Sequence, residues 1–127
     1  MVSAAADRLG LTSGPLVCVQ GQPGSAAIAL LRRLSESGAT LRYHGDFAWG
    51  GVAIARTLAA GMSWVPWRSG ADDYVEAVRR HQQAGQLAEL GGSAVDTPWD
   101  PLLSTAMTRH GVRVEEELVL DALVDDL

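Results

Sequence analysis

One acidic residue stands where a predicted strand ends, and it is the first place in this sequence where chemistry is expected. Residues 41–44 (LRYH) alternate apolar and basic side chains, and a glycine then separates them from Asp46. In an open α/β sheet, ligands and metals bind at the carboxyl ends of the strands. Asp46 is therefore predicted either to take part in chemistry or only to cap the helix or turn that follows it, since Asp is a favoured capping residue.

A strand–helix–strand unit is predicted to hold this acidic residue in place. After a Trp-Gly-Gly turn, Val52, Ala55 and Ala59 recur with the spacing of a helix. Residues 62–67 (MSWVPW) then have the composition of another strand, which Pro66 restricts to an edge or to the end of the strand. The helix therefore connects two strands.

The remaining segments add one more strand and several helices. A short apolar run at Leu16–Val19 is typical of a buried parallel strand. Helices are predicted at Val2–Leu9, Ala26–Ser37, Asp72 or Asp73 to about Gln83, Thr97 to about Arg109, and Val114–Leu127. The segment 86–96 is weakly patterned. Alternation of this kind predicts an α/β fold with a small parallel sheet of about three strands flanked by helices, followed by a helical C-terminal part.

Length and composition limit the possibilities. A chain of 127 residues suits a single domain. The formal net charge is −5, so the overall charge does not indicate nucleic-acid binding, although seven of the ten arginines lie between residues 32 and 80. The single cysteine excludes an internal disulfide and any site built from several thiolates. No apolar run approaches the ~20 residues of a membrane span and no signal peptide is recognisable, so a cytoplasmic protein is predicted.

The octapeptide HGDFAWGG at residues 44–51 resembles a known family motif. It is similar to His-Gly-Asp-Phe-Asp-Trp-Gly-Gly in the C-terminal toprim-like (DUF2399-like) domain of the Wadjet-type, or type II, plasmid-defence nuclease subunit. That domain is related to the toprim domain of the topoisomerase VI A subunit. Further matches to the family lie, in order, at residues 17–23, 66–68, 73–74 and 115–116. The resemblance covers essentially the whole chain and implies a toprim-like three-layer α/β fold.

The resemblance also implies a Mg²⁺ site built from three carboxylates. A toprim site holds the metal with a Glu after its first strand and an Asp-x-Asp pair after a later strand, and the metal polarises a phosphate. Asp46 matches the first Asp as the metal ligand, but Ala48 occupies the position of the second. The family's Glu would fall before Met1, so the chain is expected to be a C-terminal fragment that lacks the first family strand. Gln20 is the rival candidate for the Glu position.

By resemblance, the function is Mg²⁺-dependent cleavage of DNA, with an incomplete and inactive metal site in this chain. Asp46 and His44 would be the catalytic residues. The groups facing DNA phosphates would be Arg42, Gly50, Gly51 and Arg68. The expected partners are DNA, subunits of an SMC-like defence complex, and a second copy of the chain joined through an exposed sheet edge. The rival function is a non-catalytic protein-binding or assembly module on the same scaffold, which Ala48 favours.

Several other residues have two interpretations that the sequence leaves open. Glu115–Glu117 either open the last helix, where acidic residues suit the helix dipole, or form an acidic lobe near Asp46. Trp49 either belongs to the core or lines a binding groove. The turn Gly21–Ser25 either binds a phosphate or is a plain tight turn. His44 either contacts a phosphate or makes a structural hydrogen bond.

Overall fold

The computed structural model describes residues 9–10, 14–17 and 23–127. Its elements, in chain order, are α2 (Ser25–Glu36), β1 (Arg42–Tyr43), α3 (Trp49–Gly61), β2 (Val65–Pro66), α4 (Ala71–His81), the 3₁₀ helix η2 (Gln82–Ala84), β3 (Ala88–Glu89), α5 (Pro101–His110), β4 (Val112–Arg113), the 3₁₀ helix η3 (Glu116–Val119) and α6 (Leu120–Asp125). Residues 2–8 of the predicted helix Val2–Leu9 lie outside the described residues, as do Gln20 and the second half of the predicted strand Leu16–Val19. Its first half, Leu16 and Val17, is described and is not in a strand, and Val17 is exposed instead of buried.

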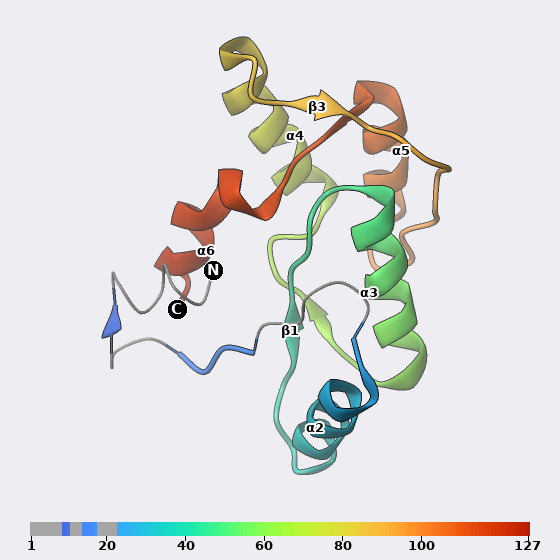
Figure 1. The fold of residues 1–127 in the computed structure, drawn as a ribbon, viewed down its shortest axis with the longest axis vertical. Coiled ribbons are helices and arrows are strands. Elements are labelled where there is room, and N and C mark those ends of the chain that lie inside the picture. Colours follow the sequence, from blue (N-terminus) through green and yellow to red (C-terminus); the bar gives the residue numbers. More distant parts are fainter. Residues whose placement is uncertain (1–8, 11–13, 18–22) are drawn as a thin grey trace.

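The predicted strand–helix–strand unit forms a parallel pair, which confirms the α/β class (Figure 1). β1 and β2 pair with Arg42 opposite Val65 and Tyr43 opposite Pro66, and α3 is the connection between them. Backbone bonds from Val65 N to Leu41 O and from Trp67 N to Tyr43 O, both 2.8 Å, extend the pairing. The parallel sheet has two strands among the described residues, where about three were expected.

A second, antiparallel pair was not predicted. β3 and β4 pair with Ala88 opposite Arg113, although 86–96 was interpreted as weakly patterned. The chain reverses after α5 at Gly111, whose φ of 65° suits glycine, and then runs extended instead of helical. The last helix therefore begins at Leu120 and not at Val114. Val114 instead bridges to Phe47, by bonds of 2.8 and 3.1 Å.

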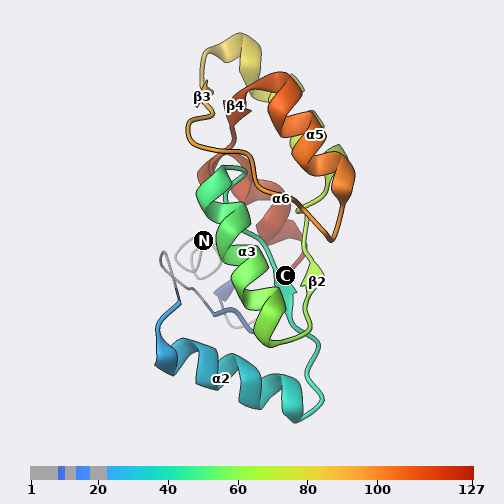
Figure 2. The same cartoon turned by 90° about the vertical axis from the view of Figure 1, so that its right-hand side faces the viewer.

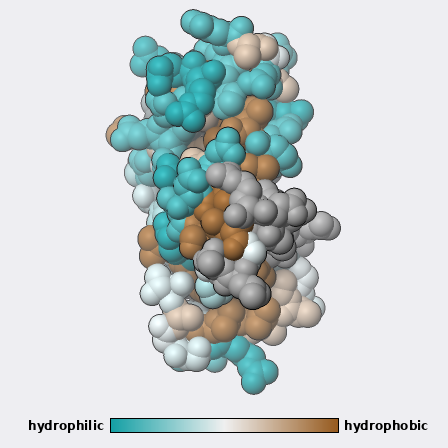
Figure 3. Space-filling view, turned by 90° about the vertical axis from the view of Figure 1, so that its left-hand side faces the viewer, coloured by the Kyte–Doolittle hydropathy of each residue, from teal (hydrophilic) through white to brown (hydrophobic). Residues whose placement is uncertain are grey.

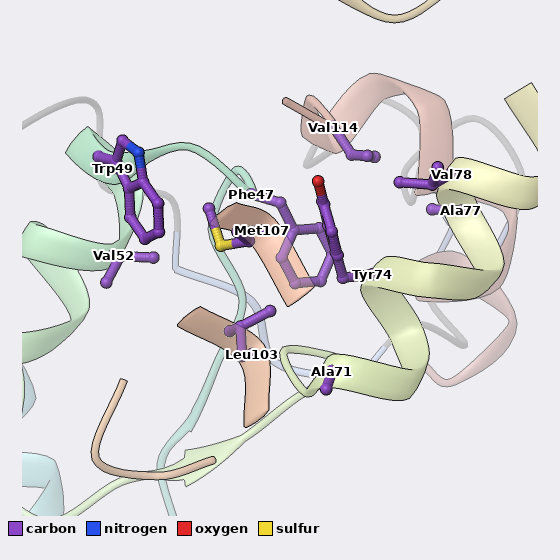
Figure 4. Packing of buried hydrophobic residues seen from close by; sticks show 10 residues of the cluster. All are labelled: Phe47, Trp49, Val52, Ala71, Tyr74, Ala77, Val78, Leu103, Met107 and Val114. Carbon is purple, nitrogen blue, oxygen red and sulfur yellow. The ribbon is translucent and has the colours of Figure 1, made fainter. Parts of the chain in front are cut away.

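The hydrophobic core lies where α3, α4 and α5 meet the segment after β4 (Figure 4). Its cluster of buried residues is Phe47, Trp49, Val52, Ala71, Tyr74, Ala77, Val78, Leu103, Met107 and Val114. The rings of Phe47 and Tyr74 lie 5.4 Å apart at 60°. The interpretation of Trp49 as a core residue is confirmed, since its side chain is buried in this cluster. The core thus fixes the start of α3, directly after Asp46.

The starts of α4 and α5 share one capping residue. Asp100 is the N-cap of α5, with Oδ1 accepting from Leu102 N at 3.1 Å and Oδ2 accepting from Ala71 N at 2.8 Å. Thr97, the predicted start of this helix, lies before it: its hydroxyl accepts from Ser104 N and donates to Asp100 O, and the helix begins at Pro101. The N-cap of α4 is Gly70, whose backbone N–H donates to Asp73 Oδ2 at 3.0 Å, so the helix begins just before the predicted start at Asp72 or Asp73.

The end of the molecule that carries α2 is packed less tightly than the core. The predicted helix Ala26–Ser37 is confirmed as α2, but none of its residues is buried. Figures 1 and 2 show α2 at the end opposite α4. On the face drawn in Figure 3, hydrophilic side chains gather toward the α4 end and hydrophobic ones are more frequent toward α2. Among the described residues, none of the helices has the length and apolar character needed to cross a membrane.

Candidate functional site

The chain turns sharply between β1 and α3, and Asp46 sits at this turn. Its carbonyl oxygen accepts from Ala48 N at 2.9 Å, and α3 begins one residue later at Trp49. Gly50 and Gly51 therefore lie in the first turn of the helix, where a separate Trp-Gly-Gly turn was predicted. The two glycines differ: a Cβ on Gly51 would overlap the Asp46 carbonyl, whereas a Cβ on Gly50 would meet open space. Gly51 thus permits a close backbone approach, and its neighbour within the chain is Asp46.

The Asp46 carboxylate points to the C-terminal part of the chain. Its Oδ1 accepts a 2.7 Å hydrogen bond from Glu116 N, at the start of η3. Asp46 does not cap α3, since the N-cap of α3 is Ala48 and no side chain bonds there. The carboxylate is exposed, and its Oδ2 makes no hydrogen bond within the described part of the chain. One carboxylate oxygen is therefore used for folding and the other is available to a ligand.

Glu116 and Tyr43 form the electrostatic surroundings of Asp46. Burial raises the pKa of Glu116, and the negative charge of Asp46 raises it further. Burial, Asp46 and Glu116 together raise the pKa of Tyr43 to about 12. The structure therefore places Glu116 in an acidic lobe beside Asp46. Sequence reasoning missed Tyr43 as a neighbour of the site, although its position three residues before Asp46 on the same strand pattern was a signal.

His44 is a half-buried residue between β1 and the turn. Its Nδ1 lies 3.0 Å from the Trp67 carbonyl oxygen, so Nδ1 must carry the proton and donate. Its ring makes edge contacts with Phe47 and Trp67. Burial lowers the pKa of His44, and its Nε2 is buried with no hydrogen-bond partner. The structural hydrogen bond expected as one of two roles is thus present, and the catalytic role of His44 stays a prediction.

The two arginines predicted to face phosphate gather around Trp67 at the end of β2. Arg68, with a φ of 47°, donates from Nε and Nη2 to Asp126 at 2.6 and 2.9 Å. The Trp67 indole also donates to Asp126, at 2.8 Å. Arg42 lies over the Trp67 ring, 5.5 Å from its centroid. The bonds from Arg68 hold the pKa of Asp126 down to about 2, so a phosphate would have to compete with this carboxylate for Arg68.

The residues present fit the implied Mg²⁺ only in part. No group of three His, Cys, Asp or Glu side chains suited to a metal occurs among the residues that the structure describes. Asp46 and Glu116 supply at most two carboxylates, and Ala48 supplies none. Mg²⁺ can be held by one or two carboxylates together with substrate phosphates. We call the surroundings of Asp46, with Glu116 and Tyr43, the Asp46 corner. The Asp46 corner suits a weak cation site that depends on a bound phosphate, and it does not suit a complete catalytic site.

The cavity beneath Asp46 is small. Its volume is about 10 Å³, and its walls include Tyr43, Ser69 and Leu103. A space of this size holds about one water molecule. An organic ligand is therefore not accommodated at this corner, and any substrate would have to lie on the surface.

Fold and site together define an α/β domain with an acidic corner at the carboxyl end of a parallel strand. The family model described as "Protein of unknown function C-terminus (DUF2399)" matches residues 1–127. The chain belongs to this family, as its resemblance predicted. Comparison with curated proteins and with solved structures gave no match.

Proposed function

We propose that this chain is the toprim-like domain of a DNA-cleaving subunit of a Wadjet-type plasmid-defence system, with a metal site too incomplete to cleave DNA alone. The proposal is supported by membership of the DUF2399 family and by the match of residues 44–51 to the family motif. The observation that carries it is the place of Asp46 at the carboxyl side of β1, with Glu116 beside it. Proposed partners are DNA, SMC-like subunits and a second copy of the chain.

The roles of the residues follow from their geometry. A bound Mg²⁺ would supply charge that polarises a phosphate. Asp46 would face such a cation with Oδ2, because Oδ1 is already held by Glu116 N. The bond to η3 fixes the direction of the carboxylate before any ligand arrives. With two carboxylates and no third in the part of the chain that the structure describes, we assign the chain no cleavage step of its own.

The second candidate function is a protein-binding or assembly module without catalysis. A specific observation favours it: Arg68, a predicted phosphate contact, already pairs with Asp126 in a two-bond geometry. A group that is already paired within the chain contributes less to the affinity for a ligand, because its existing bond must first be broken. The two functions differ in whether the corner binds a divalent cation once its ligands are complete.

A calorimetric titration with Mn²⁺ tests the proposal. Ala48 is the N-cap of α3 and lacks a capping side chain, so Ala48→Asp would add both a carboxylate and a good cap. The matched control Ala48→Asn adds the cap without the charge. We expect weak or undetectable binding by the wild type and by Ala48→Asn, clear binding by Ala48→Asp, and loss of this binding when Asp46→Asn is added. If Ala48→Asp does not bind Mn²⁺, the result would favour the function as an assembly module.

A further inference from the structure

A second cavity lies at the other end of α3, away from Asp46. It has a volume of about 340 Å³ and is lined by Arg56, Ala59, Ala60, Trp64, Pro98 and Trp99. Figure 2 shows α3 running from the core side of the molecule toward α2, so that its C-terminal half carries this cavity. We call it the tryptophan pocket. Its volume lies in the range of ordinary small-ligand sites, roughly 300–1,000 Å³.

Two indole rings form the wall of the tryptophan pocket. The rings of Trp64 and Trp99 lie 5.3 Å apart at 57°, and Trp64 also contacts Tyr43 at 5.4 Å. Trp99 is fixed because its Nε1 donates to Ser69 O at 2.9 Å. Both indoles are only partly buried, so part of each ring remains accessible. The wall is thus an aromatic surface that exists before any ligand binds.

Two polar groups of the residues that line the tryptophan pocket, the Trp64 indole N–H and the Arg56 guanidinium, make no hydrogen bond within the described residues, whereas the Trp99 indole N–H is used. Trp64 Nε1 is buried and has no hydrogen-bond partner, which is costly for a donor unless a ligand or a small rotation of the ring satisfies it. Arg56 is exposed and makes no hydrogen bond or ion pair within the described residues. It is the one charged residue in the lining, so the pocket is positive although the chain as a whole carries −5.

We propose that the tryptophan pocket binds one unpaired nucleotide of a single-stranded nucleic acid. The base would stack on the indoles, since stacking on aromatic side chains is the usual basis of sequence-tolerant binding of single strands. An acceptor on the edge of the base would accept a hydrogen bond from Trp64 Nε1–H after a small rotation of the indole. The guanidinium of Arg56 would pair with the adjacent phosphate.

A nucleotide fits this lining better than a peptide side chain does. It combines a flat ring, an acceptor on the edge of that ring and a neighbouring negative charge. Phe and Trp side chains offer no acceptor, and Tyr offers one without the anion. The small side chains of Ala59 and Ala60 leave room for a ring to enter. This inference goes beyond the proposed function, because binding here needs no metal at Asp46.

The test measures, by fluorescence anisotropy at several salt concentrations, the binding of a fluorescein-labelled oligo-dT of 15 nucleotides to the full chain. Arg56→Gln is expected to weaken binding roughly ten-fold and to reduce the salt slope by about one ion. Ala59→Leu, which fills the pocket without removing any group, is expected to weaken binding at least as much. The control Arg109→Gln, on α5, removes an arginine outside the pocket lining and should change affinity less than about two-fold.

A ¹⁵N spectrum of the indole N–H groups adds a structural readout. The Trp64 signal, assigned through Trp64→Phe, should move when oligo-dT is added and should stay in place in Ala59→Leu. Equal affinity in all variants, equal loss with Arg109→Gln, or binding of an acidic aromatic peptide in place of oligo-dT would overturn the proposal. The oligo-dT titrations are made without any divalent cation and the Mn²⁺ calorimetry is made without DNA, so failure of the pocket and failure of the metal site are distinguishable.

Discussion

The two ends of α3 differ in the polar groups that they leave without a partner. At its start, Asp46 accepts from Glu116 N and His44 Nδ1 bonds the Trp67 carbonyl, while the acceptor His44 Nε2 has no partner among the described residues. At its end, the tryptophan pocket leaves Trp64 Nε1 without a partner in the described structure. The cavities differ as well, at about 10 Å³ against about 340 Å³. The motif at the start is recognisable in the sequence, yet the space and the unused donors lie at the other end.

The difference teaches that a motif identifies residues and does not show which of their bonds remain free. Asp46 Oδ1 and the Nε and Nη2 atoms of Arg68 already bond to groups from the last twelve residues of the chain. Whatever binds the corner must compete with these bonds or use Asp46 Oδ2, which makes no hydrogen bond within the described residues. Binding at the pocket, by contrast, breaks no internal bond.

The largest expected effect tests how tightly the Asp46 corner is built. Gly51→Ala would press a methyl group into the Asp46 carbonyl, and backbone at that point cannot move aside cheaply. We expect a loss of about 1–3 kcal/mol in the free energy of unfolding, the usual cost of overpacking. Gly50→Ala meets open space in the same helical turn and should stabilise the chain by about 0.5–1 kcal/mol. Urea unfolding measures the free energy of unfolding of the two variants. Similar changes in both would mean that the close approach at Gly51 does not exist.

Local patterns explain which parts of the fold could be predicted. The alternation at 41–44 and the helical spacing after Val52 depend on neighbours in sequence, and β1, α3 and β2 followed from them. β3 and β4 depend on pairing between Ala88 and Arg113, which two weakly patterned segments do not reveal. The start of α5 was misplaced because Thr97 and Asp100 are both good capping residues. Only the contact with α4 shows which of them is the cap.

The candidate site shows the same limit at longer range. Asp46 and its position after a strand were predictable, because strand ends and acidic residues are local features. Its bond to Glu116 joins residues separated by 70 positions, and the bonds of Arg68 to Asp126 join residues separated by 58. No pattern in a single sequence reports such pairs. The tryptophan pocket was missed for the same reason, since the contact between Trp64 and Trp99 also joins residues far apart in the sequence.

An intermediate effect concerns the pH dependence of the corner. Burial lowers the pKa of His44 below its usual 6.5, so the unfolded state binds a proton first as the pH falls. Stability should therefore decrease as the pH drops below about 6.5, and the contribution of His44 should be fully present above it. His44→Asn keeps a donor near the Trp67 carbonyl and removes the titrating group. Urea unfolding between pH 5 and 8 should show that the free energy of unfolding decreases less steeply with falling pH in this variant. An equal decrease in the variant and the wild type would mean that His44 does not cause the pH dependence.

The smallest expected effect on stability is at the tryptophan pocket, and its smallness is informative. Arg56 is exposed and has no bond within the described residues, so Arg56→Gln should change the free energy of unfolding by less than about 0.5 kcal/mol. Thermal unfolding measures this directly. A residue whose replacement weakens binding of oligo-dT but leaves stability unchanged contributes to a ligand and not to the fold. A large loss of stability would instead show that Arg56 supports the end of α3, and the contrast between the two ends of this helix would then disappear.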